Sequence, residues 1–435
     1  MKMASFARFI FYILLVAAPF STRYIFVPGI IADVEIEPGT FSLFGTQLLA
    51  LIFIVSALLS GAKNRLSRPG EFTLIGAGFL FSSAALSVVL SGDARGLVVL
   101  SWLLLGVVLA VAVNKVRPAS RYIFLALAVG GIIQSVFAAN QFIQQTVSSS
   151  KWLGVAQHLS EISGTFVVET AVGRWLRAYG TLPHPNMLGA YLVIAVIASM
   201  ALTLLINKKW RVLAMLAVVI NVWGLSLTLS RSALLALTVG LIFFVVMVLV
   251  FFHGVARRRV LVVTGLVIIV FFQSSLLLLD PFSARVLGRG RLEHISIESR
   301  LNQLADVQLL LRDQRLFGVG SGLMPLALHE QDSSRSPWDY QYVHNVPLLI
   351  LVETGVPGLL FWLIVICGVL GSAKYTLKHR VNIRTVVFSA VFLALLTGAM
   401  FDHFLWTSWF GQLIFWSMVG LLIGNSSQND VSSPE

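Results

Sequence analysis

Charged residues are scarce in this sequence, since Asp, Glu, Lys and Arg make up only 11% of its 435 residues. Hydrophobic residues account for 57%, whereas a soluble domain carries about 25% charged residues and roughly half apolar ones. Runs of about 20 mainly apolar residues, the length that crosses the hydrocarbon core of a bilayer, recur along the chain. The scarcity of charge therefore excludes a soluble domain and predicts an all-α polytopic membrane protein.

The sequence has only one cysteine and lacks the common cofactor motifs. The single Cys367 lies inside an apolar run, so no intramolecular disulfide can form and redox chemistry is not expected. There is no Asp-x-Asp pair, no His, Cys and Glu group at metal-ligand spacing, no Walker-type phosphate loop and no nucleophile elbow. We therefore expect no metal and no nucleotide cofactor. The energy for a reaction must then come with the substrate, as it would with a sugar linked to a lipid diphosphate.

About twelve segments are long and apolar enough to be membrane spans. They cover approximately residues 6–20, 41–60, 71–91, 96–113, 121–144, 186–206, 210–229, 232–252, 260–279, 345–372, 384–401 and 405–424. A cleaved signal peptide over 1–21 is the alternative for the short first segment, since Lys2 and Arg8 precede its apolar run, but a clear small-x-small cleavage site is lacking. We expect one integral membrane domain over 1–435, with a disordered cytoplasmic tail over 425–435.

The formal net charge of +12 reflects topology and predicts no nucleic-acid partner. Short, nearly acid-free basic connections alternate along the chain, as the positive-inside rule requires of cytoplasmic loops. They carry Lys2, Arg8; Lys63, Arg65, Arg68; Lys115, Arg117, Arg121; Lys208, Lys209, Arg211; Arg257, Arg258, Arg259; and Lys374, Lys378, Arg380, Arg384. Nearly all acidic residues fall in the intervening connections, so both termini are expected in the cytoplasm.

Two long connections are expected on the side opposite the basic loops. The first covers residues 145–185, and the second, 280–344, is the largest extramembrane piece. Within the second, apolar residues of 296–312 recur at helical spacing, which predicts an amphipathic helix on the membrane surface or on the spans. The glycine run 318–322 ends this helix. Because no strand precedes it, the run is not a dinucleotide-binding fingerprint.

A histidine marks the point where the second long connection re-enters the membrane. His344 and Asn345 begin the apolar segment that contains Glu353. An imidazole there can accept a proton from a hydroxyl group at neutral pH, although a helix cap is the structural alternative. A carboxylate inside a span is rarely without function. We interpret His344 as the strongest catalytic candidate, with Asn345 and Glu353 beside the substrate and Asp402-His403 as a weaker, supporting pair.

Arg231 lies in a tight outward turn between two apolar segments, with Ser230 and Ser232 beside it. Snorkelling to lipid head groups is the structural alternative. We favour a function, because a guanidinium that sinks into the bilayer costs a few kcal/mol unless an anion or a cavity meets it. The planar fork of a guanidinium suits a diphosphate, to which it can donate two parallel hydrogen bonds.

The first long connection carries three further candidates, Arg174, Arg177 and His184. Surface pairs with Glu161 or Glu169 are the structural alternative for the two arginines, and such pairs contribute little. His184 lies between two prolines that fix its backbone, which indicates either positioning or a structural turn.

Basic residues also appear in the second connection, on an otherwise acidic side of the chain. Arg300 lies near the start of the amphipathic helix, and Arg285, Arg289 and Arg291 precede it. A solvated helix face is the structural alternative. The cluster could instead meet the phosphates of an acceptor lipid.

These blocks together resemble the O-antigen ligase and polymerase superfamily of bacterial envelope glycosyltransferases. The matching residues are Arg177…Gly180-Thr-x-x-His184-Pro-Asn186, Ser230-Arg231-Ser232, Glu298-Ser-Arg300, Gly318-x-Gly320-x-Gly322, His344-Asn-x-x-Leu…Glu353-x-Gly355-x-x-Gly358 and Asp402-His403-x-Leu-Trp406. They cover roughly the C-terminal 60% of the chain, and their order makes the resemblance fairly specific. Within the superfamily the chain is most similar to the WaaL-type O-antigen ligases.

The resemblance implies a GT-C-like membrane glycosyltransferase that works without a metal and inverts the transferred sugar. Its donor would be a glycan on undecaprenyl diphosphate, and its acceptor a sugar hydroxyl of lipid A–core. The reaction would take place among membrane lipids, on the periplasmic face of a Gram-negative inner membrane. Arg177 and Arg231 would then bind the donor diphosphate, with Arg300 as a further contact. His344 would assist deprotonation of the acceptor.

Other activities remain alternatives. An O-antigen polymerase would share the donor and extend a growing glycan, and a protein O-oligosaccharyltransferase would glycosylate Ser, Thr or Tyr. A polysaccharide transporter or flippase would account for twelve spans equally well. It would, however, require broken helices or ionisable residues near the bilayer midplane, whereas the polar groups of this chain gather at one face.

Overall fold

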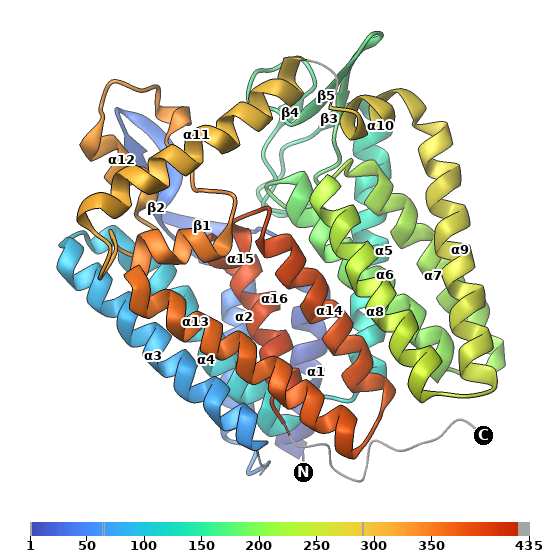
Figure 1. The fold of residues 1–435 in the computed structure, drawn as a ribbon. Helices are drawn as coiled ribbons and strands as arrows, with labels where there is room; N and C mark the ends of the chain where they lie inside the picture. Colours follow the sequence, from blue (N-terminus) through green and yellow to red (C-terminus); the bar gives the residue numbers. More distant parts are fainter. Residues whose placement is uncertain (1, 63, 65, 289–290, 425–435) are drawn as a thin grey trace.

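Long helices that stand side by side make up most of the structure, which is a computed structural model (Figure 1). The structure describes residues 2–62, 64, 66–288 and 291–424. Lys63, Arg65, Arg289 and the tail over 425–435, all considered in the sequence analysis, lie outside the described residues. The mainly helical, apolar architecture is that of a polytopic membrane protein and confirms the expected fold class.

Within the described residues, eight helices are long and apolar enough to cross a membrane. They are α3 (Arg68–Ser91), α4 (Leu97–Val116, preceded by the turn η1, Ala94–Gly96), α5 (Ser120–Gln144), α6 (Pro185–Leu205), α7 (Lys208–Leu227), α8 (Arg231–Phe251), α9 (Val255–Leu277) and α13 (Val346–His379). A helix pairs most of its backbone N–H and C=O groups within itself, which is the condition for crossing lipid.

The remaining four expected spans form shorter helices. These are α1 (Lys2–Ala17), α2 (Gly45–Leu58), α14 (Ile383–Ala399) and α16 (Trp409–Leu422). At 1.5 Å per residue, α2 with its 14 residues is about 21 Å long, less than the hydrocarbon thickness of about 30 Å. Eight of the twelve expected segments therefore form candidate spans of full length, and the other four contain shorter helices.

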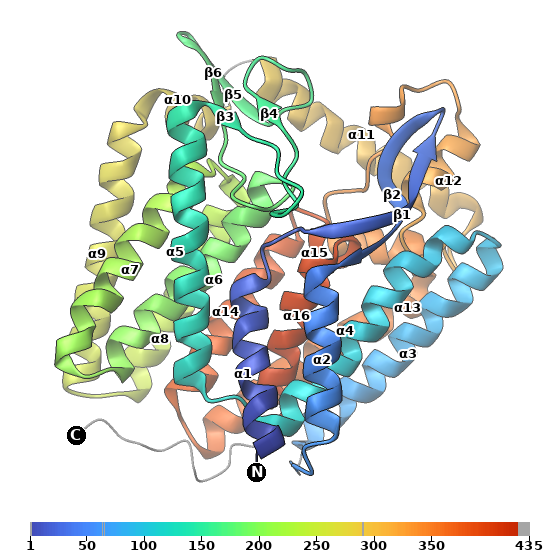
Figure 2. The same cartoon turned by 180° about the vertical axis from the view of Figure 1, so that it is seen from behind.

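The basic connections gather at one end of the bundle. Figures 1 and 2 show at that end the start of α1, the end of α16 and the connections between α2 and α3, α4 and α5, α6 and α7, α8 and α9, and α13 and α14. Lys208, Arg257 and Arg380 are among the basic residues there. The two long connections lie at the opposite end, which we call the hairpin end because all three β-hairpins are there.

Three two-stranded antiparallel hairpins were not expected from the sequence. They are β1 (Arg23–Ile31) with β2 (Val34–Phe44), β3 (Thr146–Val147) with β4 (His158–Leu159), and β5 (Val167–Thr170) with β6 (Gly173–Leu176). Ala32 and Asp33 both have positive φ, 46° and 62°, which is the backbone of a two-residue hairpin turn. Because β2 continues to Phe44, α2 begins only at Gly45, inside the expected span 41–60.

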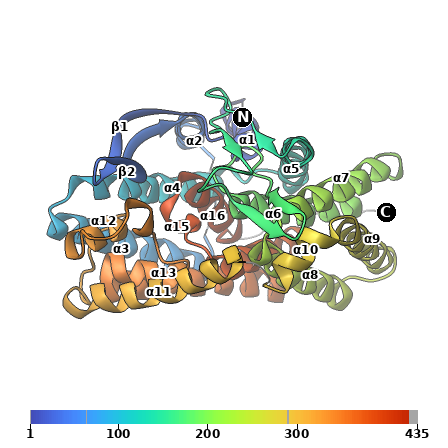
Figure 3. The same ribbon diagram turned by 90° about the horizontal axis from the view of Figure 1, so that it is seen from above.

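Three helices cover the hairpin end. They are α10 (Leu279–Val286), α11 (Arg291–Asp313) and α12 (Met324–Gln331). Seen from above, α11 extends along the bundle from α12 to α10 (Figure 3). It contains the amphipathic helix expected over 296–312, and this expectation is confirmed. Val307 is buried on one face of α11, while Ile297, Leu301 and Leu304 are exposed on another.

The glycine run 318–322 packs directly against a break in α13. Gly355 has φ 70° and ψ −174° within that helix, and a Cβ atom there would lie 2.0 Å from the carbonyl oxygen of Leu316. The backbone N–H of Gly320 donates to the carbonyl oxygen of Glu353 at 3.0 Å. The absence of a side chain at Gly355 therefore lets the segment after α11 approach the start of α13, where His344 lies.

Candidate active site

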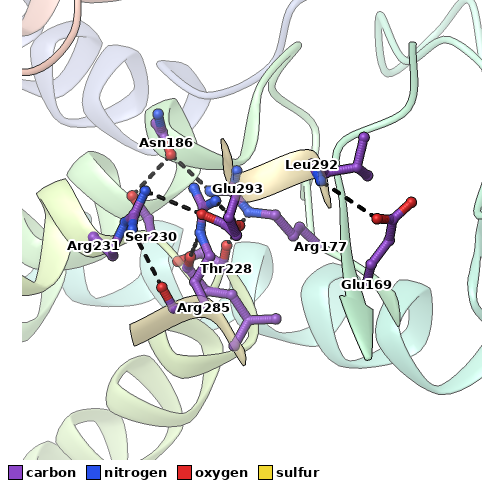
Figure 4. Close-up of polar contacts among 10 residues, drawn as sticks. Glu169, Arg177, Asn186, Thr228, Ser230, Arg231, Arg285, Leu292 and Glu293 are labelled. Atoms are coloured by element: carbon purple, nitrogen blue, oxygen red, sulfur yellow. Dashed lines mark hydrogen bonds and ion pairs between the residues drawn. The ribbon is translucent and has the colours of Figure 1, made fainter. Parts of the chain in front are cut away.

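Arginines from separate elements meet at the hairpin end, around one buried carboxylate (Figure 4). Arg231 is the first residue of α8, Arg285 lies in α10, and Glu293 lies in α11. Glu293 forms ion pairs with both arginines, with 3.2 Å between its Oε2 and Arg231 Nη2. Its side chain is 4% exposed, against 33% for Arg231. Arg231 therefore presents part of its guanidinium to the outside of the cluster.

The turn between α7 and α8 places Arg231. Leu229 adopts a positive φ of 47°, and the hydroxyl of Ser230 accepts a hydrogen bond from the Ala233 N–H as the N-cap of α8. A Ser at this position satisfies one of the free N–H groups at a helix start. The capped start directs Arg231 toward α10, where its Nη1 donates to the carbonyl oxygen of Arg285 at 3.3 Å.

Arg177 is buried beneath these arginines (Figure 4). Its Nε donates to the carbonyl oxygen of Thr228 at 2.9 Å and its Nη2 to Asn186 Oδ1 at 2.7 Å. Burial and the neighbouring Arg285 lower the pKa of Arg177 to about 9. It therefore remains a cation at neutral pH, placed by one carbonyl and one amide.

Asn186, in the first turn of α6, connects the arginines to a second carboxylate. Its Oδ1 accepts from Arg177 and from the Ser230 hydroxyl at 2.9 Å, and its Nδ2 donates to Asp402 Oδ2 at 2.8 Å. Asp402 is buried between α14 and α15 (Phe404–Thr407), and its Oδ1 accepts the His403 N–H at 2.8 Å.

Three histidines surround Asp402, namely His184, His344 and His403. Burial alone would raise the pKa of the Asp402 carboxyl. The three imidazoles and Asn186 together lower this pKa by more than burial raises it, so it lies below the ordinary value of an aspartate. Burial lowers the pKa of His184 to about 3 and that of His344 to about 4, and it lowers the pKa of His403 as well. At neutral pH the group is therefore one carboxylate among neutral imidazoles.

The tautomer of His344 follows from its contacts with Gln303 in α11. Gln303 Oε1 accepts the backbone N–H of His344 at 3.2 Å and lies 2.9 Å from its Nδ1. Because that oxygen is an acceptor, Nδ1 must carry the ring proton, and Nε2 is left with its lone pair. His344 is thereby prepared to accept a proton at Nε2.

Arg300 stands out because its donors are not used. Among the described residues it has no hydrogen bond and no ion pair, although Asp402, Arg285 and Glu293 influence it electrostatically. Burial, more than the neighbouring arginine, lowers its pKa. A partly buried guanidinium without a partner is the group an anion would meet first.

The match with a known family falls on this region. Residues 216–363 match the family described as Wzy_C, O-antigen ligase. We call these matched residues the Wzy_C segment. Curated proteins give no match. The Wzy_C segment contains Arg231, Arg285, Glu293, Arg300, Gln303 and His344, whereas Arg177, Asn186 and Asp402 lie outside it.

Two basic residues expected to contact substrate lie away from the cluster around Glu293 and Asp402. Arg174, in β6, donates to the carbonyl oxygen of Glu161 at 3.0 Å. Arg291 is 70% exposed and pairs with Glu169 at 3.2 Å, beside the β5–β6 hairpin (Figure 4). Arg174 therefore contacts the backbone of Glu161 and not its carboxylate, and Arg291 lies on an exposed helix face, as its structural alternative predicted.

Two other residues expected to contact substrate act as helix caps. His184 Nδ1 accepts the Asn186 N–H at 2.9 Å as the N-cap of α6. Asn345 Oδ1 accepts the Leu348 N–H at 3.0 Å as the N-cap of α13. The capping role leaves His184 with its proton on Nε2, near Asp402.

Glu353, also expected near the substrate, is fully buried inside α13. Its Oε2 accepts from the Gly322 N–H and from Trp406 Nε1, each at 2.7 Å. The carboxylate thus connects the glycine run to α15. Within the described part of the chain, no group of three or more His, Cys, Asp or Glu residues is arranged to bind a metal ion.

Proposed function

We propose that this chain is an O-antigen ligase, which transfers a glycan from undecaprenyl diphosphate to a hydroxyl group of lipid A–core. The observation that carries the proposal is the adjacency of a cationic cluster and a neutral histidine base, joined through Asn186 and Asp402. The Wzy_C match over residues 216–363 supports the same reaction class.

The charge of the cluster fits a diphosphate. Four guanidinium groups, of Arg177, Arg231, Arg285 and Arg300, face the two carboxylates of Glu293 and Asp402. Two positive charges are left over, which a diphosphate diester with its two negative charges would balance. Arg300 and the exposed part of Arg231 offer the donors, and guanidinium forks bind phosphate oxygens in pairs.

The transfer then follows from the placement of His344. The acceptor oxygen bonds to the anomeric carbon of the donor sugar while its proton moves to His344 Nε2. The bond between that carbon and the diphosphate oxygen breaks, and the diphosphate leaves with the electron pair. The arginines stabilise the negative charge that develops on the leaving group. Attack opposite the leaving group inverts the anomeric carbon, and the Asp402 carboxylate stabilises the imidazolium that forms.

The site would lie on the periplasmic face of an inner membrane. The basic connections are at the end of the bundle opposite α10–α12, and such connections stay in the cytoplasm. Reporter fusions after Gln314 and after Lys378 should therefore report opposite sides of the membrane. Finding both on one side would refute this topology.

A deletion strain tests the reaction itself. Without the ligase, lipopolysaccharide should lose all of its O-antigen-capped chains, while lipid-linked glycan accumulates. Caps of a single repeat unit would instead indicate a polymerase, and an unchanged ladder would indicate a protein O-oligosaccharyltransferase. Purified full-length protein in lipid should also transfer glycan from an undecaprenyl diphosphate donor to lipid A–core.

A further inference from the structure

A recess whose chemistry differs from that of the arginine cluster lies beside α11. It is a groove of about 530 Å³ between α11 and the segment before α13. Its polar lining includes Glu298, Asn302, Gln303, Asp306, Arg335 and Asp339. The amides among them can donate to and accept from hydroxyl groups, and the carboxylates can accept from them. None of these residues belongs to the arginine cluster around Glu293.

The charge of the groove is opposite to that of the arginine cluster. Three carboxylates, of Glu298, Asp306 and Asp339, outnumber the single guanidinium of Arg335. Arg335 is also occupied, because its Nη1 pairs with Asp306 at 2.7 Å and its Nε with Asp332 at 3.0 Å. A phosphate group would be repelled here, so an occupant of the groove must be uncharged or cationic.

Gln303 joins the groove to the proposed base. Its side chain lines the groove, and only 4% of the residue is exposed. While Oε1 binds His344, the Nε2 group has no hydrogen-bond partner among the described residues. A buried donor without a hydrogen-bond partner is destabilising. A hydroxyl group in the groove would supply the missing acceptor. Because Gln303 also orients His344, this hydroxyl group would lie close to the proposed base.

We propose that this groove binds the acceptor glycan through an uncharged, hydroxyl-rich sugar unit, and that Gln303 Nε2 donates to one of its hydroxyl oxygens. This inference rests on the proposed transfer reaction and names the acceptor class at its site. Phosphate-bearing sugar units are excluded from the groove, and the donor diphosphate stays with Arg231 and Arg300.

Two surfaces beside the groove fit a lipid-anchored glycan. Trp338, in the turn η2 (Pro337–Asp339), is 69% exposed and adjacent in sequence to the groove residue Asp339. Its amphipathic ring can cover the apolar face of a sugar. On its outer face α11 exposes Ile297, Leu301 and Leu304, which suit the lipid interface. An amphiphilic acceptor could thus keep its acyl chains in lipid while its sugar enters the groove.

Steady-state kinetics of the full-length protein in lipid tests the assignment. With lipid A–core as acceptor and an undecaprenyl diphosphate glycan as donor, Asn302→Ala and Asp339→Ala should each raise the acceptor KM about three- to tenfold, as expected for one hydrogen bond. Their donor KM should not change. Gln308→Ala removes an exposed amide of α11 that does not line the groove, and it should behave as the unmodified protein.

Gln303→Glu separates a positioning role from a merely structural one. The carboxylate still accepts from His344 but loses the Nε2 donor, so the acceptor KM should rise. Its negative charge should also raise the pKa of His344 and move the acid limb of kcat/KM to higher pH. An unchanged acceptor KM together with an unchanged pH profile would overturn the assignment of Gln303.

A direct binding measurement tests the groove without depending on turnover. Saturation-transfer NMR with a dephosphorylated core oligosaccharide, freed from lipid A, should detect binding to the unmodified protein and to Gln308→Ala. Binding should weaken in Asn302→Ala and Asp339→Ala, and inorganic diphosphate should not displace the sugar. No binding, equal binding by all variants, or displacement by diphosphate would each overturn the groove assignment. Groove-dependent binding without transfer would overturn the proposed function alone.

Discussion

Asn186 and Asp402 are 216 positions apart in the sequence, yet the amide of one donates to the carboxylate of the other at 2.8 Å. The bond connects the start of α6 to the turn between α14 and α15. On its other side, the Asn186 carbonyl oxygen accepts from Arg177. One amide therefore positions both a cation of the proposed donor site and the carboxylate beside His344.

Replacing that amide should disturb both halves of the site. In Asn186→Ala, Arg177 and Asp402 each lose a buried hydrogen bond, and leaving such groups unsatisfied costs about 1–3 kcal/mol apiece. We expect a lower thermal unfolding temperature, a higher donor KM and a lower kcat at once. Thermal unfolding and steady-state kinetics on the same preparation would measure them. A variant that changes only one of the two kinetic constants would show that the halves are independent.

The proposed role of Arg231 can be tested by a substitution that keeps its charge and changes its hydrogen-bonding geometry. Arg231→Lys keeps the positive charge but loses the planar fork that donates two hydrogen bonds to one phosphate. Losing one charge-assisted hydrogen bond costs roughly 1.5–3 kcal/mol, or about ten- to a hundredfold in donor affinity. Titration with undecaprenyl diphosphate would show the loss. Arg291→Lys is the matched control, because Arg291 lies on the surface with Glu169 and should leave the affinity unchanged.

Much of this site could be predicted because it lies at membrane boundaries. Arg177, Arg231 and His344 stood out in the sequence as polar residues close to apolar runs, and Arg300 as a basic residue of the large connection. The structure brings all four around Asp402 and Glu293. Asp402 itself was predicted only as part of a supporting pair. Its central position depends on which helix ends meet, and spacing along the chain does not encode that.

The orientation of α11 about its own axis determines which of its residues are buried, and the sequence does not show that orientation. Glu293 and Gln303 belong to an amphipathic helix, where carboxylates and amides usually form a solvated face. Both are buried here because α11 turns them toward α10 and His344, while Arg291 points outward to Glu169. The hairpin β1–β2 did leave a signal, since Val34 to Ile36 alternate with acidic residues. Its Ala-Asp turn lacks the glycine that usually marks such a reversal.

Glu353 should be needed for stability more than for substrate binding. Glu353→Gln keeps the shape of the side chain but removes the charge that accepts from Gly322 and Trp406. Hydrogen bonds to a charged group contribute about 1.5–3 kcal/mol each, so the unfolding temperature should fall by several degrees. Trp406→Phe, which removes one of the donors to this carboxylate, should give a smaller decrease. A rise in donor KM at unchanged stability would place Glu353 at the substrate instead.

The pH dependence of transfer should reveal the base. His344 accepts a proton only when it is neutral, so activity is lost as the pH falls through its pKa. Burial lowers that pKa to about 4. The acid limb of kcat/KM should therefore lie near pH 4, below the ordinary histidine value of about 6.5, because this constant reports the free enzyme. His344→Ala should remove the limb and reduce kcat by about a hundredfold or more, with donor affinity retained.

Substituting Asp402 tests in which direction its charge shifts the pKa of His344. The Asp402 carboxylate favours protonation of His344 and raises its pKa, against the larger effect of burial. Asp402→Asn removes that negative charge, so the pKa of His344 should fall further and the acid limb should move to still lower pH. At neutral pH kcat should also decrease, because the imidazolium that forms during transfer loses its counter-ion. A limb that moves upward, or stays in place, would mean that another group accepts the proton.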